Sequence, residues 1–153
     1  MNVPTRDLTP SQKAAQKIAE ELIYRTTDAL IAGDFDTYLT CFDFPTTLES
    51  FEGNRAVNTP EDLEKVFVGI RQFLIVNNVT SLEHKFIEVE FAQSDTIHTL
   101  HETYALNGCT LVKEPFPIFS VLRHVNGRWR VTRSCYALLE TNELGRVLAP
   151  EPS

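Results

Sequence analysis

The side chains that could do chemistry gather on one face of a predicted β-sheet. His101 alternates with Thr99 and Thr103 along the chain, and alternate residues of a strand point to the same face. Polar groups on an apolar face need hydrogen-bond partners, and a ligand pocket is where such groups are useful. Beside a carboxylate, His101 could act as a general acid or base. The alternative is a histidine that hydrogen-bonds only a core threonine or a backbone group.

Two carboxylates are candidate partners for His101. Glu114 lies opposite His101 if Asn107-Gly108 forms a two-residue turn. Asp43 is the second candidate, from the link that follows a predicted short helix. The predicted catalytic set is therefore His101, Glu114 and Asp43, acting without a metal or a cofactor. His98 cannot share a metal ion with His101, because residues three apart on a strand point to opposite faces.

Arg133 is the charged candidate for ligand binding. On the inner face of the sheet its guanidinium could bind a ligand carboxylate through two hydrogen bonds. An internal ion pair with Glu114 or Glu49 is the alternative. For the aromatic candidates the alternative is ordinary core packing, and Tyr38 could lie at the pocket mouth or on the surface. The predicted ligand-binding residues are Thr99, Arg133, Ser120, Trp129, Phe67, Phe42, Phe44 and Tyr38.

Four consecutive antiparallel strands are predicted to position these residues. The clearest turn is Asn126-Gly127, because a two-residue hairpin needs positive φ at both central positions. This turn places Leu122 opposite Val131 and His124 opposite Trp129. The predicted strands are His84–Ala92, Thr96–Leu106, Glu114–Val125 and Arg128–Ala137.

The strand periodicity then assigns residues to the two faces of the sheet. A register slip of one residue would invert every assignment, so the prediction is specific. The predicted inner face carries Ile87, Val89, Phe91, Ile97, Thr99, His101, Thr103, Ile118, Ser120, Leu122, Trp129, Val131, Arg133 and Cys135.

Capping signals predict three helices before the four strands. Thr9 and Gln12 suit a capping box, and Gly33 suits a left-handed helix end. The expected elements are a helix from Pro10 to about Ala32, a short helix capped by Asp34 through Cys41, a hairpin of Thr46–Phe51 and Asn54–Asn58, and a helix from Thr59 to about Asn77.

Length and composition bound the function. A chain of 153 residues with 42% hydrophobic residues suits one domain over 1–153, with a core at about 9–138 and loose tails at 1–8 and 146–153. A formal charge of −7 without a basic block disfavours nucleic acid and anionic membranes. Three widely spaced cysteines favour reduced thiols in the cytoplasm. No apolar run is long enough to span a bilayer.

The order of the elements predicts an α+β fold, in which the three helices cover the inner face of a curved antiparallel sheet. It resembles the nuclear transport factor 2-like (cystatin-like) superfamily, SnoaL-like branch, over roughly residues 11–137. The motifs that carry the resemblance are Ala32-Gly33-Asp34-Phe35-Asp36, Cys41-Phe42-Asp43-Phe44-Pro45, Thr59-Pro60-Glu61-Asp62-Leu63 and Asn126-Gly127-Arg128-Trp129-Arg130-Val131.

The resemblance implies a cone-shaped half-barrel with an apolar pocket, and often a dimer through the outer sheet face. The superfamily includes cyclases, ketosteroid isomerases and scytalone dehydratases, whose members use Asp or His in the pocket. The resemblance therefore implies a small apolar or carboxylate-bearing organic ligand, and either acid/base catalysis of isomerase, cyclase or dehydratase type or binding alone. A protein-interaction module on the same fold is the alternative.

The predicted outer face of the sheet favours a homodimer. A contiguous apolar and aromatic strip usually marks an interface, and twofold dimers are the commonest closed assembly. The alternative is that Leu138, Leu139 or Leu144 folds back and covers the strip. The predicted strip comprises Leu100, Tyr104, Phe119, Val121 and Tyr136, mixed with Glu102, Arg123 and Arg130.

Overall fold

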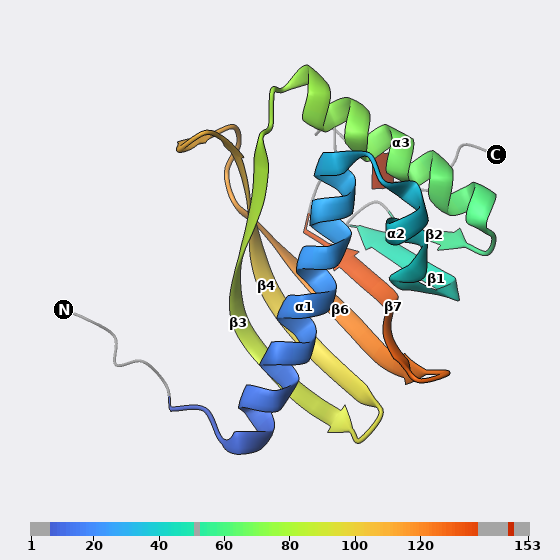
Figure 1. Cartoon of the computed structure of the whole chain (residues 1–153), viewed down its shortest axis with the longest axis vertical. Helices are drawn as coiled ribbons and strands as arrows, with labels where there is room; N and C mark the ends of the chain where they lie inside the picture. The colour runs from blue at the N-terminus through green and yellow to red at the C-terminus, as the bar shows by residue number, and fades with distance from the viewer. Residues whose placement is uncertain (1–6, 51–52, 138–146, 149–153) are drawn as a thin grey trace.

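The structure is a computed structural model that describes residues 7–50, 53–137 and 147–148. Within these ranges three helices lie on the concave side of one curved, open sheet (Figure 1), which is the predicted α+β half-barrel. The helices are α1 (Pro10–Ala32), α2 (Phe35–Thr40) and α3 (Pro60–Val76). The strands are β1 (Phe42–Ser50), β2 (Gly53–Val57), β3 (Ser81–Gln93), β4 (Thr96–Asn107), β5 (Thr110–Leu111), β6 (Phe116–Val125) and β7 (Arg128–Tyr136).

The helix boundaries follow the predicted caps. The hydroxyl of Thr9 accepts a hydrogen bond from the amide of Gln12 at 3.1 Å, and the Gln12 side chain accepts from the Thr9 amide at 2.9 Å. This capping box satisfies two amides that the first helical turn leaves without partners. Gly33 ends α1 with a φ of 75°, and Asp34 then caps α2 by accepting from the amide of Thr37 at 3.1 Å.

The strands are arranged in the order β2-β1-β7-β6-β4-β3, with β5 paired to β4. The predicted early hairpin is present as β1 and β2, although β1 begins earlier than predicted, at Phe42. Every pairing is antiparallel except that of β1 with β7, which is parallel. The sheet is therefore mixed rather than wholly antiparallel. Hairpin signals relate only strands that follow each other in the chain, and β1 and β7 come from opposite ends of it.

The hairpin between β6 and β7 confirms its predicted turn and then departs from it. Asn126 and Gly127 have φ of 51° and 79°, and Leu122 pairs with Val131. The register then shifts by one residue at a bulge. Val121 pairs with Arg133, whereas an unbroken register would pair it with Thr132. One extra residue in a strand reverses the faces beyond it. The inner-face prediction is therefore wrong for Arg133 and Cys135, and Ser134 and Tyr136 face inward instead.

The pairing of β4 with β6 is displaced by four residues from the prediction. Ile97 pairs with Leu122 and His101 with Ile118, whereas the predicted turn at Asn107-Gly108 pairs Ile97 with Ile118. That turn leads into the short β5 instead, and β6 begins only at Phe116. An even displacement keeps the faces, so the side chains of β4 point as predicted.

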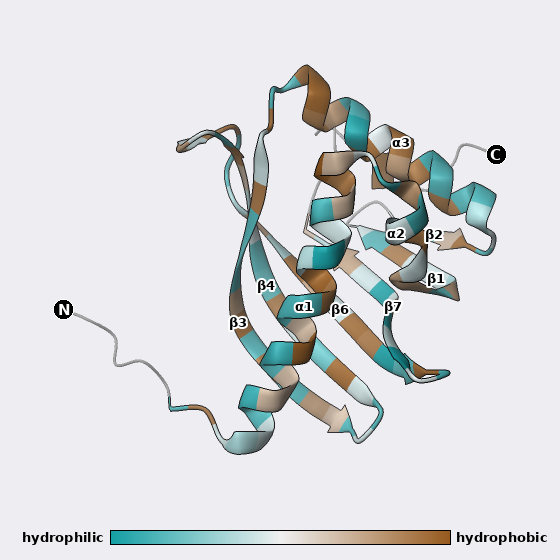
Figure 2. Cartoon of the chain, viewed as in Figure 1, coloured by the Kyte–Doolittle hydropathy of each residue, from teal (hydrophilic) through white to brown (hydrophobic). Residues whose placement is uncertain are grey.

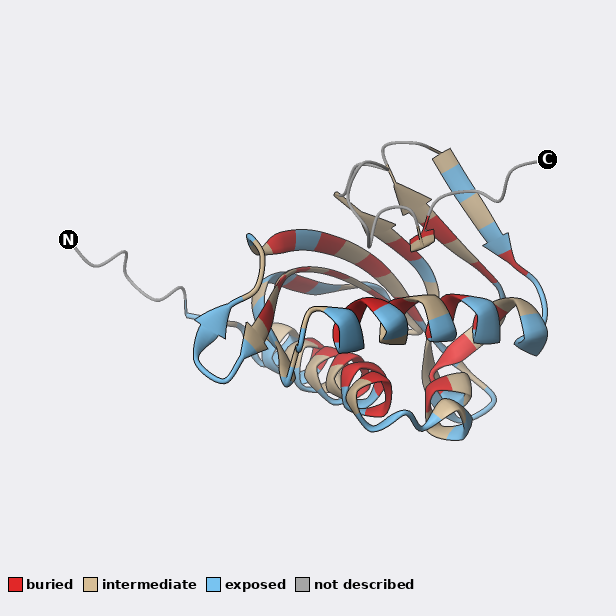
Figure 3. Ribbon diagram, turned by 90° about the horizontal axis from the view of Figure 1, so that it is seen from above, coloured by how far each residue is buried: buried red, intermediate tan, exposed pale blue. Residues whose placement is uncertain are grey.

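A second bulge, between Phe86 and Glu88 of β3, moves Ile87 from its predicted inner position to the exposed side. Val89 and Phe91 point inward as predicted, and His84 and Phe86 join them. The core lies between this face of the sheet and the helices. Figure 2 shows apolar and polar bands alternating along the strands, and Figure 3 shows the buried residues facing the helices.

Two residues beyond the sheet also belong to the core. Leu148 is fully buried, and Arg55 donates a hydrogen bond from Nη1 to the carbonyl of Val147 at 2.6 Å. Val147 lies so close to α3 that a Cβ added to Gly69 would be 2.7 Å from its Cγ1. Residues 147–148 thus pack tightly where the sequence predicts a loose tail. The predicted arm at 1–6, residues 51–52 of the early hairpin, the remaining tail residues, and Leu138, Leu139 and Leu144 lie outside the described residues.

No helix within the described part of the chain is both long enough and apolar enough to cross a lipid bilayer.

Candidate functional site

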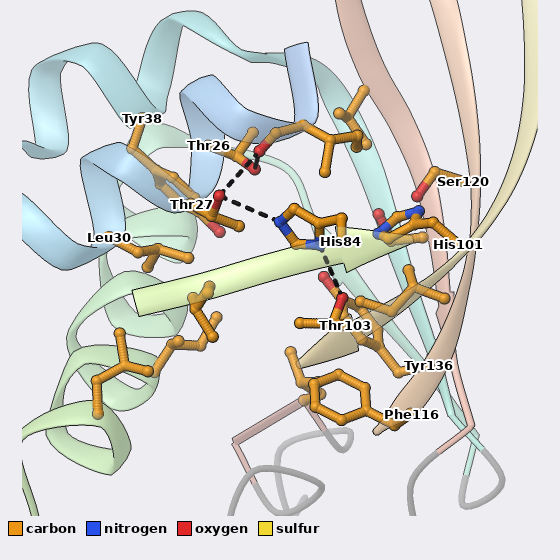
Figure 4. Close-up of a pocket in the computed structure, with 18 of the residues that line it drawn as sticks. Thr26, Thr27, Leu30, Tyr38, His84, His101, Thr103, Phe116, Ser120 and Tyr136 are labelled. Atoms are coloured by element: carbon orange, nitrogen blue, oxygen red, sulfur yellow. Dashed lines mark hydrogen bonds between the residues drawn. The ribbon is translucent and has the colours of Figure 1, made fainter. Parts of the chain in front are cut away.

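A cavity of about 80 Å³ lies between the helices and the inner face of the sheet. Residues of α1, α2 and α3 form one wall, and residues of β1, β3, β4, β6 and β7 form the other (Figure 4). Leu148 contributes from beyond the sheet. The cavity is lined by Ile23, Thr26, Thr27, Leu30, Tyr38, Phe42, Ile70, Phe73, Leu74, Leu82, His84, His101, Thr103, Phe116, Ile118, Ser120, Val131, Ser134, Tyr136 and Leu148.

The described lining includes no aspartate, glutamate, lysine or arginine. Its polar groups are two imidazoles, two phenol hydroxyls and the hydroxyls of threonines and serines. A mostly apolar wall with a few placed polar groups is the usual form of a small-molecule site. The site can therefore exchange hydrogen bonds, but its described wall offers no fixed charge to a ligand.

His84 is held on both sides of its ring. Nδ1 lies 3.1 Å from the hydroxyl oxygen of Thr103, and Nε2 lies 3.2 Å from that of Thr27 (Figure 4). The backbone amide of His84 donates to the hydroxyl of Tyr24 at 3.2 Å. Burial lowers the pKa of His84 to about 4, because the interior disfavours the charged imidazolium. His84 is therefore neutral near pH 7.

His101 lies next to His84 on the cavity wall, with the ring centroids 5.1 Å apart and the planes at 87°. The residue is 1% exposed, and its ring also packs against Phe86 with the centroids 5.4 Å apart. Its Nδ1 has no hydrogen-bond partner among the described residues. Burial lowers the pKa of His101 to about 3, and the neighbouring His84 adds a smaller effect in the same direction.

Two tyrosines complete the polar lining. Tyr38 is buried on α2, and its ring packs against Phe42 at 4.8 Å and Phe67 at 5.1 Å. Burial raises the pKa of Tyr38, and it raises the pKa of Tyr136 to about 12 against an opposing hydrogen bond with Ser134. Both hydroxyls therefore keep their protons near pH 7 and remain neutral donors and acceptors.

Four of the predicted site residues line the cavity: His101, Ser120, Phe42 and Tyr38. The sequence left the position of Tyr38 open, and in the structure this side chain lines the cavity. Four further candidates are buried or half-buried but do not line the cavity. Thr99 is fully buried, Phe67 belongs to the core, and Phe44 and Trp129 are half-buried against the core.

Three predicted residues are not brought to the cavity: Arg133, Glu114 and Asp43. The bulge in β7 turns Arg133 outward, where its Nε lies 2.8 Å from Oε1 of Glu49. This is one of the two ion pairs that the sequence left as alternatives. Glu114 precedes β6 and no longer lies opposite His101. Asp43 follows the inward-facing Phe42, so strand alternation directs it away.

Sequence reasoning missed His84, Thr27, Tyr136 and Leu148. The strand alternation of Ile87, Val89 and Phe91 placed His84 on the outer face, and the bulge at residue 87 reverses that assignment. One signal could have found it, since His84 alternates with Phe86 in the sequence. No such signal marks Leu148, because its position depends on a turn that packs on α3 after the sheet is complete.

Neither a protein-family model nor a curated protein sequence matches this chain. Solved structures match its fold. An NTF-2 like protein of unknown function from Shewanella oneidensis MR-1 is 12% identical, with a TM-score of 0.62 over 80% of this chain and 98% of that one. A protein named provisionally as a scytalone dehydratase, from Novosphingobium aromaticivorans, is 14% identical, with a TM-score of 0.61 over 84% and 87%. A ketosteroid isomerase-like protein from Erwinia carotovora atroseptica is 16% identical, with a TM-score of 0.54 over 85% and 97%.

The chain therefore has the cystatin-like fold of the nuclear transport factor 2-like proteins. This is the fold that the motifs of the sequence resemble. Identities this low establish the fold alone, and function on such a fold depends on the site that it carries.

Proposed function

We propose that this protein binds a small organic molecule in the cavity between its helices and its sheet. The observation that carries the proposal is an apolar cavity whose wall holds two neutral imidazoles and two neutral phenols. Buried histidines with strongly lowered pKa values are more typical of functional sites than of a core that serves packing alone. A pair of them on a cavity wall is suited to recognise a ligand.

Binding is better supported than acid/base catalysis. A general base works best when its pKa lies near the working pH, whereas the pKa of His101 is lowered to about 3. No carboxylate among the described lining residues is placed to raise it. The predicted partners Glu114 and Asp43 lie elsewhere. The names of the dehydratase and isomerase-like neighbours support a small-molecule site by analogy of fold alone. This analogy does not replace the carboxylate that the described cavity lining lacks.

A homodimer is also part of the proposal. Leu100, Tyr104, Phe119 and Val121 of the predicted outer strip are half-buried on the convex side of β4 and β6. Tyr136 leaves the strip for the cavity, so the proposed interface is smaller than predicted. The three cysteines carry free thiols, which agrees with the cytoplasmic location that we propose.

The test of binding is mass spectrometry on the freshly purified protein, first under native conditions and then after denaturation, to detect a molecule that copurifies. The variant Ser120→Phe places a ring in the cavity, and Ala14→Phe adds the same ring on the exposed side of α1. We expect the bound mass in the wild type and in Ala14→Phe, and its loss in Ser120→Phe. Circular dichroism checks that both variants fold. Equal retention of the bound molecule by Ser120→Phe would refute the function. So would a wild-type protein that carries no copurified molecule and binds no added one.

A further inference from the structure

The two histidines of the cavity differ in how much of their hydrogen-bonding capacity the protein uses. The hydroxyl of Thr27 lies 3.4 Å from the carbonyl oxygen of Ile23 and 3.3 Å from that of Tyr24. Both are acceptors only, so the Thr27 hydroxyl donates to its own helix, as threonines in helices commonly do. Its oxygen is then free to accept from Nε2–H of His84.

This assignment fixes the tautomer of His84. A neutral imidazole carries one hydrogen, so Nδ1 of His84 is the acceptor and the hydroxyl of Thr103 donates to it. One proton arrangement thus satisfies both ring nitrogens and both threonines. His84 has no ring nitrogen left for a ligand.

His101 retains the capacity that His84 lacks. Its side chain lines the cavity, and its buried Nδ1 has no hydrogen-bond partner among the described residues. A buried polar side chain without a partner is costly, and a ligand that supplies the partner recovers that cost. Ser120, which pairs with Thr99 on the neighbouring strand, makes no described hydrogen bond to this nitrogen.

The charge around the cavity restricts what the ligand can be. No charged side chain belongs to the described lining. The ammonium group of Lys113 lies 4.9 Å from the centroid of the Phe116 ring and 5.9 Å from that of Phe73, and it is not one of the lining residues. Taking an ion out of water without a counter-charge in contact costs more than its apolar surface returns. A neutral molecule is favoured.

We propose that the ligand is a neutral, largely apolar alcohol or phenol whose hydroxyl hydrogen-bonds to the imidazole of His101. This inference rests on the proposed binding function and adds the chemical class to it. A hydroxyl both donates and accepts, so it can pair with a ring nitrogen of His101 in either tautomer, whereas a carbonyl oxygen can pair only with a protonated nitrogen. A carboxylate ligand is not expected, because Arg133, the predicted clamp, is paired with Glu49 outside the cavity.

Three probes of the same ring size test the inference: phenol, toluene and benzoate. Toluene replaces the hydroxyl of phenol by a methyl group of similar volume, and benzoate adds a negative charge. Binding is measured by titration with NMR detection of the protein. We expect phenol to bind about fivefold more tightly than toluene, the ratio that one neutral hydrogen bond gives. Benzoate should bind more weakly than both.

Two variants of β4 assign the contact. His101→Phe keeps a ring and removes Nδ1, and the preference for phenol over toluene should disappear. His98→Phe makes the same change on the opposite face of the same strand, and it should keep the preference. In the wild type, ¹⁵N-labelled histidine gives a measurement that needs no variant: phenol should shift a ring-nitrogen resonance of His101, and toluene should not.

The outcomes separate the two proposals. If none of the probes enters the cavity, the binding function fails and this inference fails with it. If toluene binds as tightly as phenol, the cavity binds apolar molecules and the hydroxyl assignment is wrong. Tighter binding of benzoate would overturn the neutral class. A phenol preference that survives in His101→Phe, with no shift of either ring-nitrogen resonance of wild-type His101, would overturn the contact.

Discussion

The hydroxyl oxygen of Thr27 lies 3.2 Å from Nε2 of His84, and this hydrogen bond joins helix α1 to strand β3 within the cavity wall. Thr27→Val removes the acceptor and leaves a buried N–H without a partner. We expect the free energy of unfolding to fall by about 1–3 kcal/mol, measured by urea denaturation at pH 7.

The adjacent Thr26 provides the matched control for Thr27. Its hydroxyl is equally buried, but it donates only to the carbonyl of Ile23 in its own helix, at 2.6 Å. Thr26→Val should therefore cost less than about 1 kcal/mol, because it leaves no other side chain without a partner. Equal losses in the two variants would show that the contact with His84 contributes nothing.

Stability should decrease in mild acid because of the two buried histidines. Their pKa values are lowered in the folded protein, to about 4 for His84 and about 3 for His101, from the ordinary 6.5. Between pH 6.5 and these values the unfolded chain binds more protons than the folded one, so the free energy of unfolding falls as the pH falls. The slope contributed by each histidine approaches about 1.4 kcal/mol per pH unit.

Urea denaturation at intervals from pH 7.5 to pH 5 measures this slope, and NMR of the imidazole C–H groups reports the protonation of each ring. We expect the His84 and His101 resonances to remain those of neutral imidazole throughout this range. Titration of either ring near pH 6.5 in the folded protein would contradict the burial argument.

Replacing Arg133 should leave ligand binding unchanged. Its Nε and Nη2 each lie 2.8 Å from an oxygen of Glu49, on the outer side of the sheet. The pair is partly exposed, so Arg133→Ala should lower the free energy of unfolding by at most about 1 kcal/mol. Glu49→Ala should cost a similar amount, and the double variant little more than either alone. Phenol affinity, measured in the same variants, should not change. A marked loss of affinity would show that Arg133 contributes to ligand binding.

The proposed dimer predicts an effect of charge on the outer face. Phe119 lies there at the centre of the strip and packs against His98 with ring centroids 5.5 Å apart. Phe119→Glu should convert the dimer to a monomer, measured by light scattering at micromolar concentration, because a buried unpaired carboxylate opposes association. Ala14→Glu adds the same charge on the exposed side of α1 and should leave the mass unchanged. A monomeric wild type would remove the dimer from the proposal.

The parts of the fold that the sequence predicts are those decided by neighbours in the chain. The caps at Thr9, Gly33 and Asp34 satisfy backbone groups within one turn, so residue type alone reports them. The Asn126-Gly127 turn is equally local, because only the φ angles of two residues must be met. These signals place the helices and the last hairpin correctly.

The candidate site was harder to predict because bulges intervene. An extra residue near Thr132 exchanges Arg133 for Ser134 on the inner face, and another at Ile87 brings His84 inward. Neither bulge contains a glycine or proline that would indicate it. A bulge bends its strand and adds to the local twist, and strand alternation alone does not reveal where it occurs. His101 was placed correctly because β4 is regular along its inner face.

The C-terminal turn has a consequence for a shortened chain. Leu148 is fully buried and lines the cavity, and it follows the last described strand in the chain. A chain cut after Tyr136 would keep the three helices and every described strand, but its cavity wall would lack this side chain. The sheet and the helices alone therefore do not complete the surface that a ligand would contact, and a shortened chain could fold and still bind poorly.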